Sequence, residues 1–325
     1  MVKKSLSCNE SRVQVSKKEG TKIMADVMQN AKISDWGKFF STEPKPREYV
    51  LPGLMPGTVG SIVSPGGQGK SILALMLSCL VGGGIDLLDL GTFPMGNVVY
   101  LSAEDNEDIL HERVFHIGCR LDIGQRQNCM EGVVSKDLTR CDPDLINGEH
   151  AAAWREAIES EATGSRLLIL DTLRSFHSAD ENNSTGMSVL IGYLRAIAAR
   201  TGCAILFLHH TSKSSATNGQ ADQQQASRGS SVLTDNIRWQ AYLAGMTSEE
   251  SEKLTDDDGQ PIGEDRSYYV RFGISKQNYG SPFTEKWYRR GKGGILEPVS
   301  LSPATRKLEI VGSRKESNGN GHRHE

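Results

Sequence analysis

The chain has 325 residues, 37% of them hydrophobic, and carries 37 lysines and arginines against 40 aspartates and glutamates. This composition excludes disorder over the whole length and fits one large or two small soluble domains with a buried core. The formal net charge of −3 excludes a protein that coats nucleic acid through bulk positive charge, so any nucleic-acid contact is expected to be local.

The six cysteines are scattered and form no Cys-x-x-Cys pair, and no paired histidines stand at ligand spacing. This pattern argues against a zinc site or a disulfide framework and favours the cytoplasm of a cell. No apolar segment follows the basic N-terminal residues, so we expect no secretory signal. The apolar segment 72–85 is too short to cross a bilayer and is interpreted as a buried helix.

Three parts are expected along the chain. Residues 1–47 are polar, basic and weakly periodic, which predicts a partly disordered extension with a short helix near Thr21–Gln29. Residues 48–302 are predicted to form one domain, and residues 303–325 a polar tail.

Short apolar runs alternate with helical patterns in the central part. The predicted strands are Val59–Val63, Val98–Leu101, Leu167–Leu170 and Ala204–Leu208. The predicted helices are Ile72–Leu80, Ile109–Ile117, Ala151–Ala162 and Met187–Arg200. Apolar strands separated by helices predict an α/β fold with a mostly parallel twisted sheet flanked by helices. Three later runs predict added antiparallel strands at one sheet edge: Ile237–Leu243, Tyr268–Ser275 and Lys286–Arg290.

The strongest local signal is SPGGQGKS at residues 64–71, between the first predicted strand and the first predicted helix. This is the pattern of a phosphate-binding loop (Walker A, or P-loop), in which backbone N–H groups and a helix N-terminus face the phosphates of ATP. Lys70 is expected to reach the β- and γ-phosphates, and the Ser71 hydroxyl to bind Mg²⁺. The remaining ATP-binding residues are expected to be Gly66, Gly67, Gln68 and Gly69.

One position departs from the usual pattern, since Ser64 stands where the loop normally begins with glycine. The alternative interpretation is a glycine-rich turn that happens to carry a lysine.

A second metal ligand is expected at the end of a neighbouring strand. Asp171 follows the apolar run 167–170 and is the candidate for Mg²⁺, the alternative being a capping aspartate. Because Thr172 rather than a glutamate comes next, the residue that activates water must lie elsewhere. Glu104, after the strand 98–101, is the predicted general base in preference to Asp105, which could instead cap the following helix.

Two histidines end the strand 204–208. His210 is predicted to contact the γ-phosphate as a sensor, with His209 packed behind it, and neither is expected to bind a metal.

These motifs together resemble the core of RecA-type hexameric helicases. More closely, residues 49–298 resemble the RepA replicative helicases of IncQ-type plasmids. The motifs occur in the expected order: VSPGGQGKS, YLSAED, LDTLRSFH, LHHTSK, DQQQASRGSSVLTDNIRWQ and VRFGISKQNYG. The resemblance does not extend well over residues 1–47.

The resemblance implies a bacterial, cytoplasmic homohexamer that hydrolyses ATP between subunits and moves 5′→3′ along single-stranded DNA in plasmid replication. A plasmid primase and an origin-binding initiator are possible further partners. The resemblance also implies an arginine finger, which Arg238 matches, and a trans-acting Lys276, although the arginine of the family's Lys-x-Arg pattern is absent. An ordinary surface arginine is the alternative for Arg238.

DNA contact is expected from the two long loops 175–186 and 211–227. Around the second loop, Lys213 and Arg228 are candidates for phosphate contact, the alternative being a loop without function.

Two other functions fit the same motifs. A recombination or repair ATPase would form filaments on DNA, and a regulatory or partition switch would hydrolyse ATP without unwinding.

Overall fold

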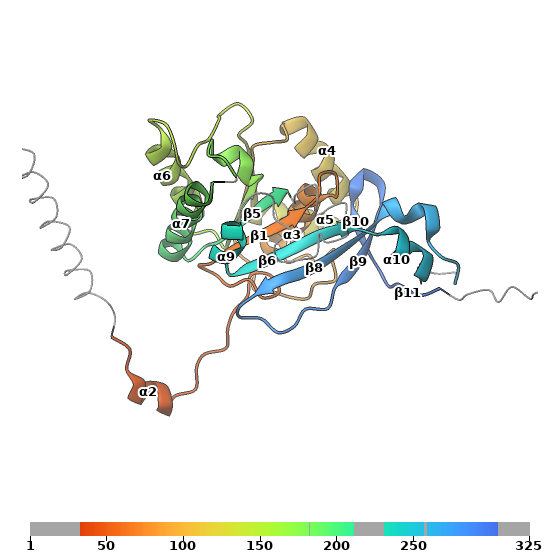
Figure 1. The fold of residues 1–325 in the computed structure, drawn as a ribbon, viewed down its shortest axis with the longest axis horizontal. Helices are drawn as coiled ribbons and strands as arrows, with labels where there is room; N and C mark the ends of the chain where they lie inside the picture. The colour runs from red at the N-terminus through yellow and green to blue at the C-terminus, as the bar shows by residue number, and fades with distance from the viewer. Residues whose placement is uncertain (1–32, 182, 211–230, 257–258, 305–325) are drawn as a thin grey trace, which may run out of the picture. The chain divides into compact units, whose positions relative to one another are not determined.

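Two compact units divide the chain, residues 1–47 and residues 48–325. The computed structural model describes residues 33–181, 183–210, 231–256 and 259–304, which are drawn in colour in Figure 1. In the first unit, helix α2 (Trp36–Ser41) begins after Asp35, whose side chain accepts a hydrogen bond from the backbone N–H of Lys38 at 3.0 Å. The helix predicted near Thr21–Gln29 lies outside the described residues.

A nine-stranded sheet forms the centre of the second unit, with the order β10-β9-β8-β6-β1-β5-β4-β2-β3. Its strands are β1 (Val59–Ser64), β2 (Val98–Ser102), β3 (Val133–Asp137), β4 (Leu167–Asp171), β5 (Ala204–His210), β6 (Trp239–Gly245), β8 (Tyr269–Gln277), β9 (Lys286–Arg290) and β10 (Leu296–Val299). The pairings from β3 across to β6 are parallel, and those among β6, β8, β9 and β10 are antiparallel. The predicted α/β fold with a mostly parallel sheet is therefore confirmed. A separate small sheet pairs β7 (Leu254–Thr255) with β11 (Ser302–Pro303).

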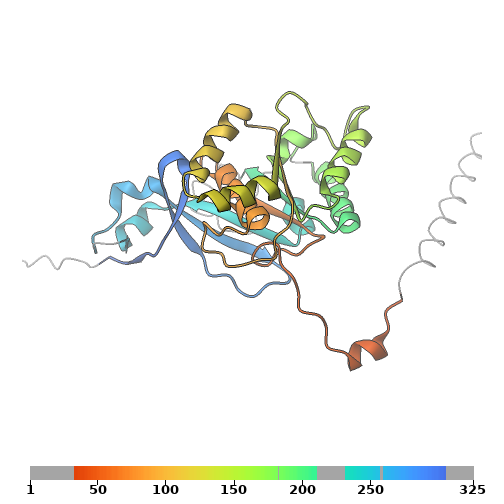
Figure 2. The same cartoon turned by 180° about the vertical axis from the view of Figure 1, so that it is seen from behind.

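Helices cover both faces of the parallel part (Figures 1 and 2). The helices of this unit are α3 (Lys70–Gly83), α4 (Glu107–Gly118), α5 (Ile123–Gly132), α6 (Ala151–Ala162), α7 (Ser184–Thr201), α9 (Ser231–Asn236) and α10 (Ser248–Lys253). Three short 3₁₀ turns complete the unit: η1 (Leu173–Phe176), η2 (Gly263–Tyr268) and η3 (Lys292–Gly294).

Strand β4 is almost entirely apolar because both of its faces are buried. Leu167 and Ile169 pack in the core on the face that α3 and α4 cover, whereas Leu168 and Leu170 pack in the core on the face of α6 and α7. Because successive side chains of a strand point to opposite faces, a strand buried on both sides needs a continuous apolar run.

All the strands and helices predicted from the sequence between residues 59 and 290 are present, most of them longer by a few residues at one or both ends. Elements that were not predicted include α5, α9, β3, β7, β10 and β11. One prediction is wrong in part, since β6 is not an antiparallel edge strand: it runs parallel to β1 and lies inside the sheet, and the antiparallel strands begin only at β8.

The pairing register brings the ends of four strands together at one edge of the sheet. Ser64 at the end of β1 lies opposite His210 at the end of β5. Asp171 at the end of β4 lies opposite Ser102 at the end of β2. Ligands of open parallel sheets collect at this carboxyl edge, so the fold places the predicted site residues where such a ligand would bind.

Candidate nucleotide-binding site

The predicted phosphate loop is the turn from β1 into α3. Gly67 and Gly69 adopt φ angles of 73° and 93°, which a residue with a side chain rarely adopts, so the glycines allow this tight turn. The loop ends at Lys70, the first residue of α3, and the N-terminal amides of this helix are free to face an anion.

Lys70 is almost fully buried at this turn, with 6% of its surface exposed. Its Nζ donates to the backbone oxygens of Ser64 and Pro65, both at 3.3 Å, and to Ser64 Oγ at 3.2 Å. Burial lowers the pKa of Lys70 to about 8, although the charges of Asp171 and Glu104 act in the opposite direction. The ammonium group is therefore held by neutral oxygens that a phosphate could replace.

Ser64 has a definite role in this arrangement. Its hydroxyl accepts from Lys70 and donates to the backbone oxygen of Pro65 at 2.8 Å. A glycine at the first loop position would offer Lys70 no such hydroxyl.

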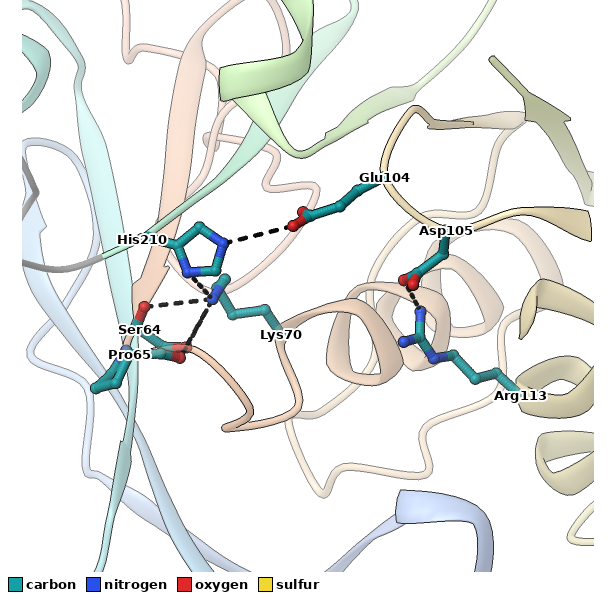
Figure 3. A network of polar contacts seen from close by, with 7 residues as sticks. All are labelled: Ser64, Pro65, Lys70, Glu104, Asp105, Arg113 and His210. Carbon is teal, nitrogen blue, oxygen red and sulfur yellow. Dashed lines mark hydrogen bonds and ion pairs between the residues drawn. The ribbon is translucent and has the colours of Figure 1, made fainter. Parts of the chain in front are cut away.

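His210 connects Lys70 to Glu104 (Figure 3). Lys70 Nζ lies 3.2 Å from His210 Nδ1, and His210 Nε2 lies 3.9 Å from Glu104 Oε1. Since an ammonium group can only donate, Nδ1 accepts and Nε2 carries the proton that faces Glu104. The His210 ring, together with the Thr172 hydroxyl and Lys70, lowers the pKa of Glu104, so this carboxylate is ionised at neutral pH.

Asp105 is not available in the same way. Its carboxylate forms an ion pair with Arg113 of α4, on the side of the site away from His210 (Figure 3). The expectation that Asp105 caps α4 is wrong, because Asn106 is the cap and its side chain accepts from the Ile109 N–H at 3.2 Å. Of the two acids, Glu104 is the one that faces His210.

Asp171 is 1% exposed and lies beside the start of α3. Burial raises its pKa, against hydrogen bonds from Tyr100 and Ser71 that lower it. One carboxylate oxygen, Oδ1, is buried and has no hydrogen-bond partner. A carboxylate oxygen left free beside a serine hydroxyl fits Mg²⁺, which prefers oxygen ligands and takes its other ligands from water and phosphates.

Among the residues that the structure describes, no metal site is built from protein ligands alone. In the described parts of the chain, no group of three or more histidines, cysteines, aspartates or glutamates could hold a metal ion. Mg²⁺ would therefore depend on Ser71 and Asp171 together with a bound nucleotide.

Most of these residues line one cavity of about 370 Å³, although Ser64 and Asp171 are not part of its lining. The predicted residues that line it are Gly67, Gly69, Lys70, Ser71, Glu104 and His210. Its lining also includes Asp105 and Ile72, and five residues that were not predicted as site residues: Arg113, Thr172, Arg290, Gly293 and Gly294. Gln68 does not line the cavity, but its side chain accepts a hydrogen bond from Arg290 at 2.6 Å.

Arg238 and Lys276 lie at the other end of β1. The Arg238 N–H donates to the backbone oxygen of Val59, the first residue of β1, at 3.2 Å. Lys276 Nζ donates to the backbone oxygen of Thr234 at 2.7 Å, at the end of α9. Arg238 also lines a second cavity, of about 440 Å³, together with Arg195 and Tyr279. These two cations therefore do not reach the phosphate loop of their own subunit.

Three further predictions have simple outcomes. His209 is buried in β5, as expected. Lys213 and Arg228 lie outside the described residues, as does the whole of the loop 211–227. Among the described residues, no helix is long and apolar enough to span a membrane.

Two comparisons with known proteins gave matches. The model of a family described as an AAA domain matches residues 28–216, which is more than half of the chain. A solved structure titled "Crystal structure of the RadB recombinase" is similar with a TM-score of 0.49 and 13% sequence identity, over 77% of this chain and 93% of that chain.

Proposed function

The chain belongs to the AAA domain family of P-loop ATPases, and from this we propose that it is a ring-forming, ATP-dependent DNA helicase. The closer resemblance of its motifs to the RepA helicases of IncQ-type plasmids supports a homohexamer that moves along single-stranded DNA, 5′→3′, during plasmid replication. A plasmid primase and an origin-binding initiator would be its partners in this role.

The observation that carries ATP hydrolysis is the contact chain from Lys70 through His210 to Glu104 at the mouth of the phosphate loop. Lys70 would leave its neutral oxygens and bind the β- and γ-phosphates. Glu104, already ionised, would orient a water and take its proton as the oxygen of that water bonds to the γ-phosphorus and the bond to the β-phosphate oxygen breaks. Mg²⁺, when bound at Ser71 and Asp171, would offset the negative charge of the phosphates.

His210 would connect the phosphate to the base. It contacts both Lys70 and Glu104, so a movement of Lys70 toward the nucleotide removes the partner of Nδ1 and frees that atom. This is the expected behaviour of a residue that senses whether a γ-phosphate is present.

The position of Arg238 supports assembly into a ring. The phosphate loop lies at one end of β1 and Arg238 at the other, where it lines a cavity of about 440 Å³. Head-to-tail contacts between subunits close into a ring when the rotation allows it. In such a ring Arg238, with Lys276 beside it, would stabilise the charge that develops on the nucleotide of the neighbouring subunit.

Lys70→Ala tests the proposal directly. The wild-type protein is expected to hydrolyse ATP faster when single-stranded DNA is added and to displace a strand from a partial duplex. The variant is expected to do neither, and strand displacement by Lys70→Ala would refute the proposal.

The shared site is tested by mixing variants. Subunits carrying Arg238→Ala are mixed with subunits carrying Lys70→Ala, so that some interfaces regain an intact loop and an intact finger. Activity that is neither partly restored nor reduced when either variant is mixed with the wild type would show that hydrolysis does not occur between subunits.

Particle images with ATP and single-stranded DNA separate the other functions. Closed six-fold rings support the helicase. Filaments would favour a recombination or repair ATPase. Slow hydrolysis with no strand displacement would favour a regulatory or partition switch.

A further inference from the structure

The C-terminal part of the sheet reaches the nucleotide cavity through the turn between β9 and β10. Arg290, the last residue of β9, lines the cavity together with Gly293 and Gly294 of η3. The turn is closed by two backbone hydrogen bonds, from Gly291 N–H to Ile295 at 2.8 Å and from Gly294 N–H to Gly291 at 3.1 Å. It is therefore an ordered wall of the cavity.

The two glycines let the turn come this close. Gly293 and Gly294 have φ angles of 69° and 77°, and a Cβ on Gly293 would collide with His116 of α4. A Cβ on Gly294 would meet nothing within 4 Å. The turn thus packs against α4 on one side and leaves open space on the other.

Arg290 has an unusual environment for an arginine in this protein. Its guanidinium group donates to a neutral partner, from Nη2 to the side-chain oxygen of Gln68 at 2.6 Å, and its Nε is buried with no hydrogen-bond partner. Among the described residues no carboxylate pairs with it. Burial alone lowers its pKa, and no neighbouring negative charge compensates.

The neighbouring Arg289 shows the contrast. Its side chain is about half exposed and lies 4.0 Å from the carboxylate of Asp256. An exposed arginine needs no partner, whereas a partly buried guanidinium group without an anion is energetically unfavourable. The environment of Arg290 is therefore incomplete without an anion.

The anion that fits is a phosphate of the nucleotide. Gln68 lies in the middle of the phosphate loop, so its partner Arg290 is beside the place where the phosphates would bind. The guanidinium group offers donors in a planar fork that matches phosphate oxygens, and one of them, Nε, is unused.

We infer that Arg290 is a nucleotide-binding residue that contacts the phosphate chain of the nucleotide held by the loop of its own subunit, and that Gln68 holds the guanidinium group until the nucleotide arrives. The inference rests on the proposed ATP site. It differs from the role of Arg238, which lies at the opposite end of the sheet and would act on a neighbour.

The test is nucleotide affinity, measured by fluorescence anisotropy with N-methylanthraniloyl-ATP on the full chain. Arg290→Ala removes a charge-assisted contact, so this variant is expected to bind the nucleotide about 10- to 100-fold more weakly than the wild type. Arg290→Lys is expected to recover part of this loss, because it keeps the charge without the fork. The matched control is Arg289→Ala, which is expected to bind as the wild type does.

A double variant separates direct contact from positioning of the loop. If Arg290 contacts the phosphates, Arg290→Ala weakens binding by a similar factor in a Gln68→Ala background. If Arg290 only positions Gln68, the two single variants have equal effects and the double variant is no worse, which would overturn the inference. Arg290→Gln, which keeps a donor for Gln68 without the charge, is expected to bind as weakly as Arg290→Ala.

The two proposals fail in different ways. If neither the wild type nor Lys70→Ala binds the nucleotide, the ATP site itself is wrong. If the wild type binds, Lys70→Ala does not, and Arg290→Ala binds as tightly as the wild type, only the role of Arg290 is wrong.

Discussion

The affinity for ATP is expected to fall as the pH rises above about 8, because of the environment of Lys70. Without nucleotide, burial lowers the pKa of Lys70 from 10.5 to about 8. Bound phosphates carry negative charge and raise this pKa again, so binding takes up a proton at any pH between the two values.

The magnitude follows from the fraction of charged lysine. With a pKa of about 8, roughly nine-tenths of the Lys70 side chains are charged near pH 7 and roughly one-tenth near pH 9. Neutral lysine must gain a proton before it can bind phosphate, so the affinity is expected to fall by up to about tenfold for each pH unit above about 8. The terminal phosphate is fully ionised over this range and contributes no slope of its own.

The assay is a titration with fluorescent ATP from about pH 7 to about pH 9.5, together with calorimetry in buffers of different ionisation enthalpy, which counts the protons taken up. The control is Lys70→Arg, whose guanidinium group does not titrate here, so that any residual binding is expected to have no slope. A flat affinity for the wild type over this range, with no proton uptake, would refute the reasoning.

Three other substitutions test the surroundings of the site and the core. Tyr100→Phe removes a hydrogen bond to buried Asp171 and is expected to lower the free energy of unfolding by about 1–3 kcal/mol. The Tyr100 hydrogen bond lowers the Asp171 pKa and so stabilises the ionised carboxylate that burial disfavours; in urea denaturation this cost should therefore be larger near pH 7, where more of Asp171 is ionised, than near pH 4, and equal costs would contradict it. Ser64→Gly removes a partner of Lys70 in the empty site and is expected to tighten ATP binding about threefold to fivefold, whereas weaker binding would argue against this competition. Leu168→Ala, in the core under α6 and α7, should cost about 2–5 kcal/mol in urea denaturation, and a loss below about 1 kcal/mol would mean that the cavity collapses.

The strands and helices of the parallel core could be predicted from the sequence because local residue patterns there determine the secondary structure. A strand such as β4 is buried on both faces and therefore has an unbroken apolar sequence. The spacing of glycines, lysine and serine in the loop 64–71 identifies a phosphate-binding loop. The elements that were missed lack these signals. Strand β3 lies at the sheet edge with no fully buried residue, and α5 buries none of its residues.

The missed residues of the cavity have a different cause. Arg290 is 222 positions from Gln68 in the chain, and nothing near it in the sequence marks a site. Its place follows from the antiparallel strands β8 and β9, which return the chain to the edge where β1 ends. Arg113 is similar: it stands eight positions after Asp105, which is not the spacing of a helical ion pair, and only the fold shows that the two side chains pair beside the nucleotide cavity.

The two ends of β1 have a consequence for how neighbouring subunits would communicate. This strand is six residues long, fully buried, and hydrogen-bonded to β5 on one side and to β6 on the other. Its first residue, Val59, holds the backbone of Arg238, and its last residue, Ser64, holds Lys70. At about 3.3 Å per residue, only about 20 Å of strand separates the end of β1 beside Arg238 from the end beside the phosphate loop. In a head-to-tail ring, a structural change on hydrolysis at one interface would therefore reach the next interface through a single strand. Sequential hydrolysis around the ring would need no moving domain between the two sites.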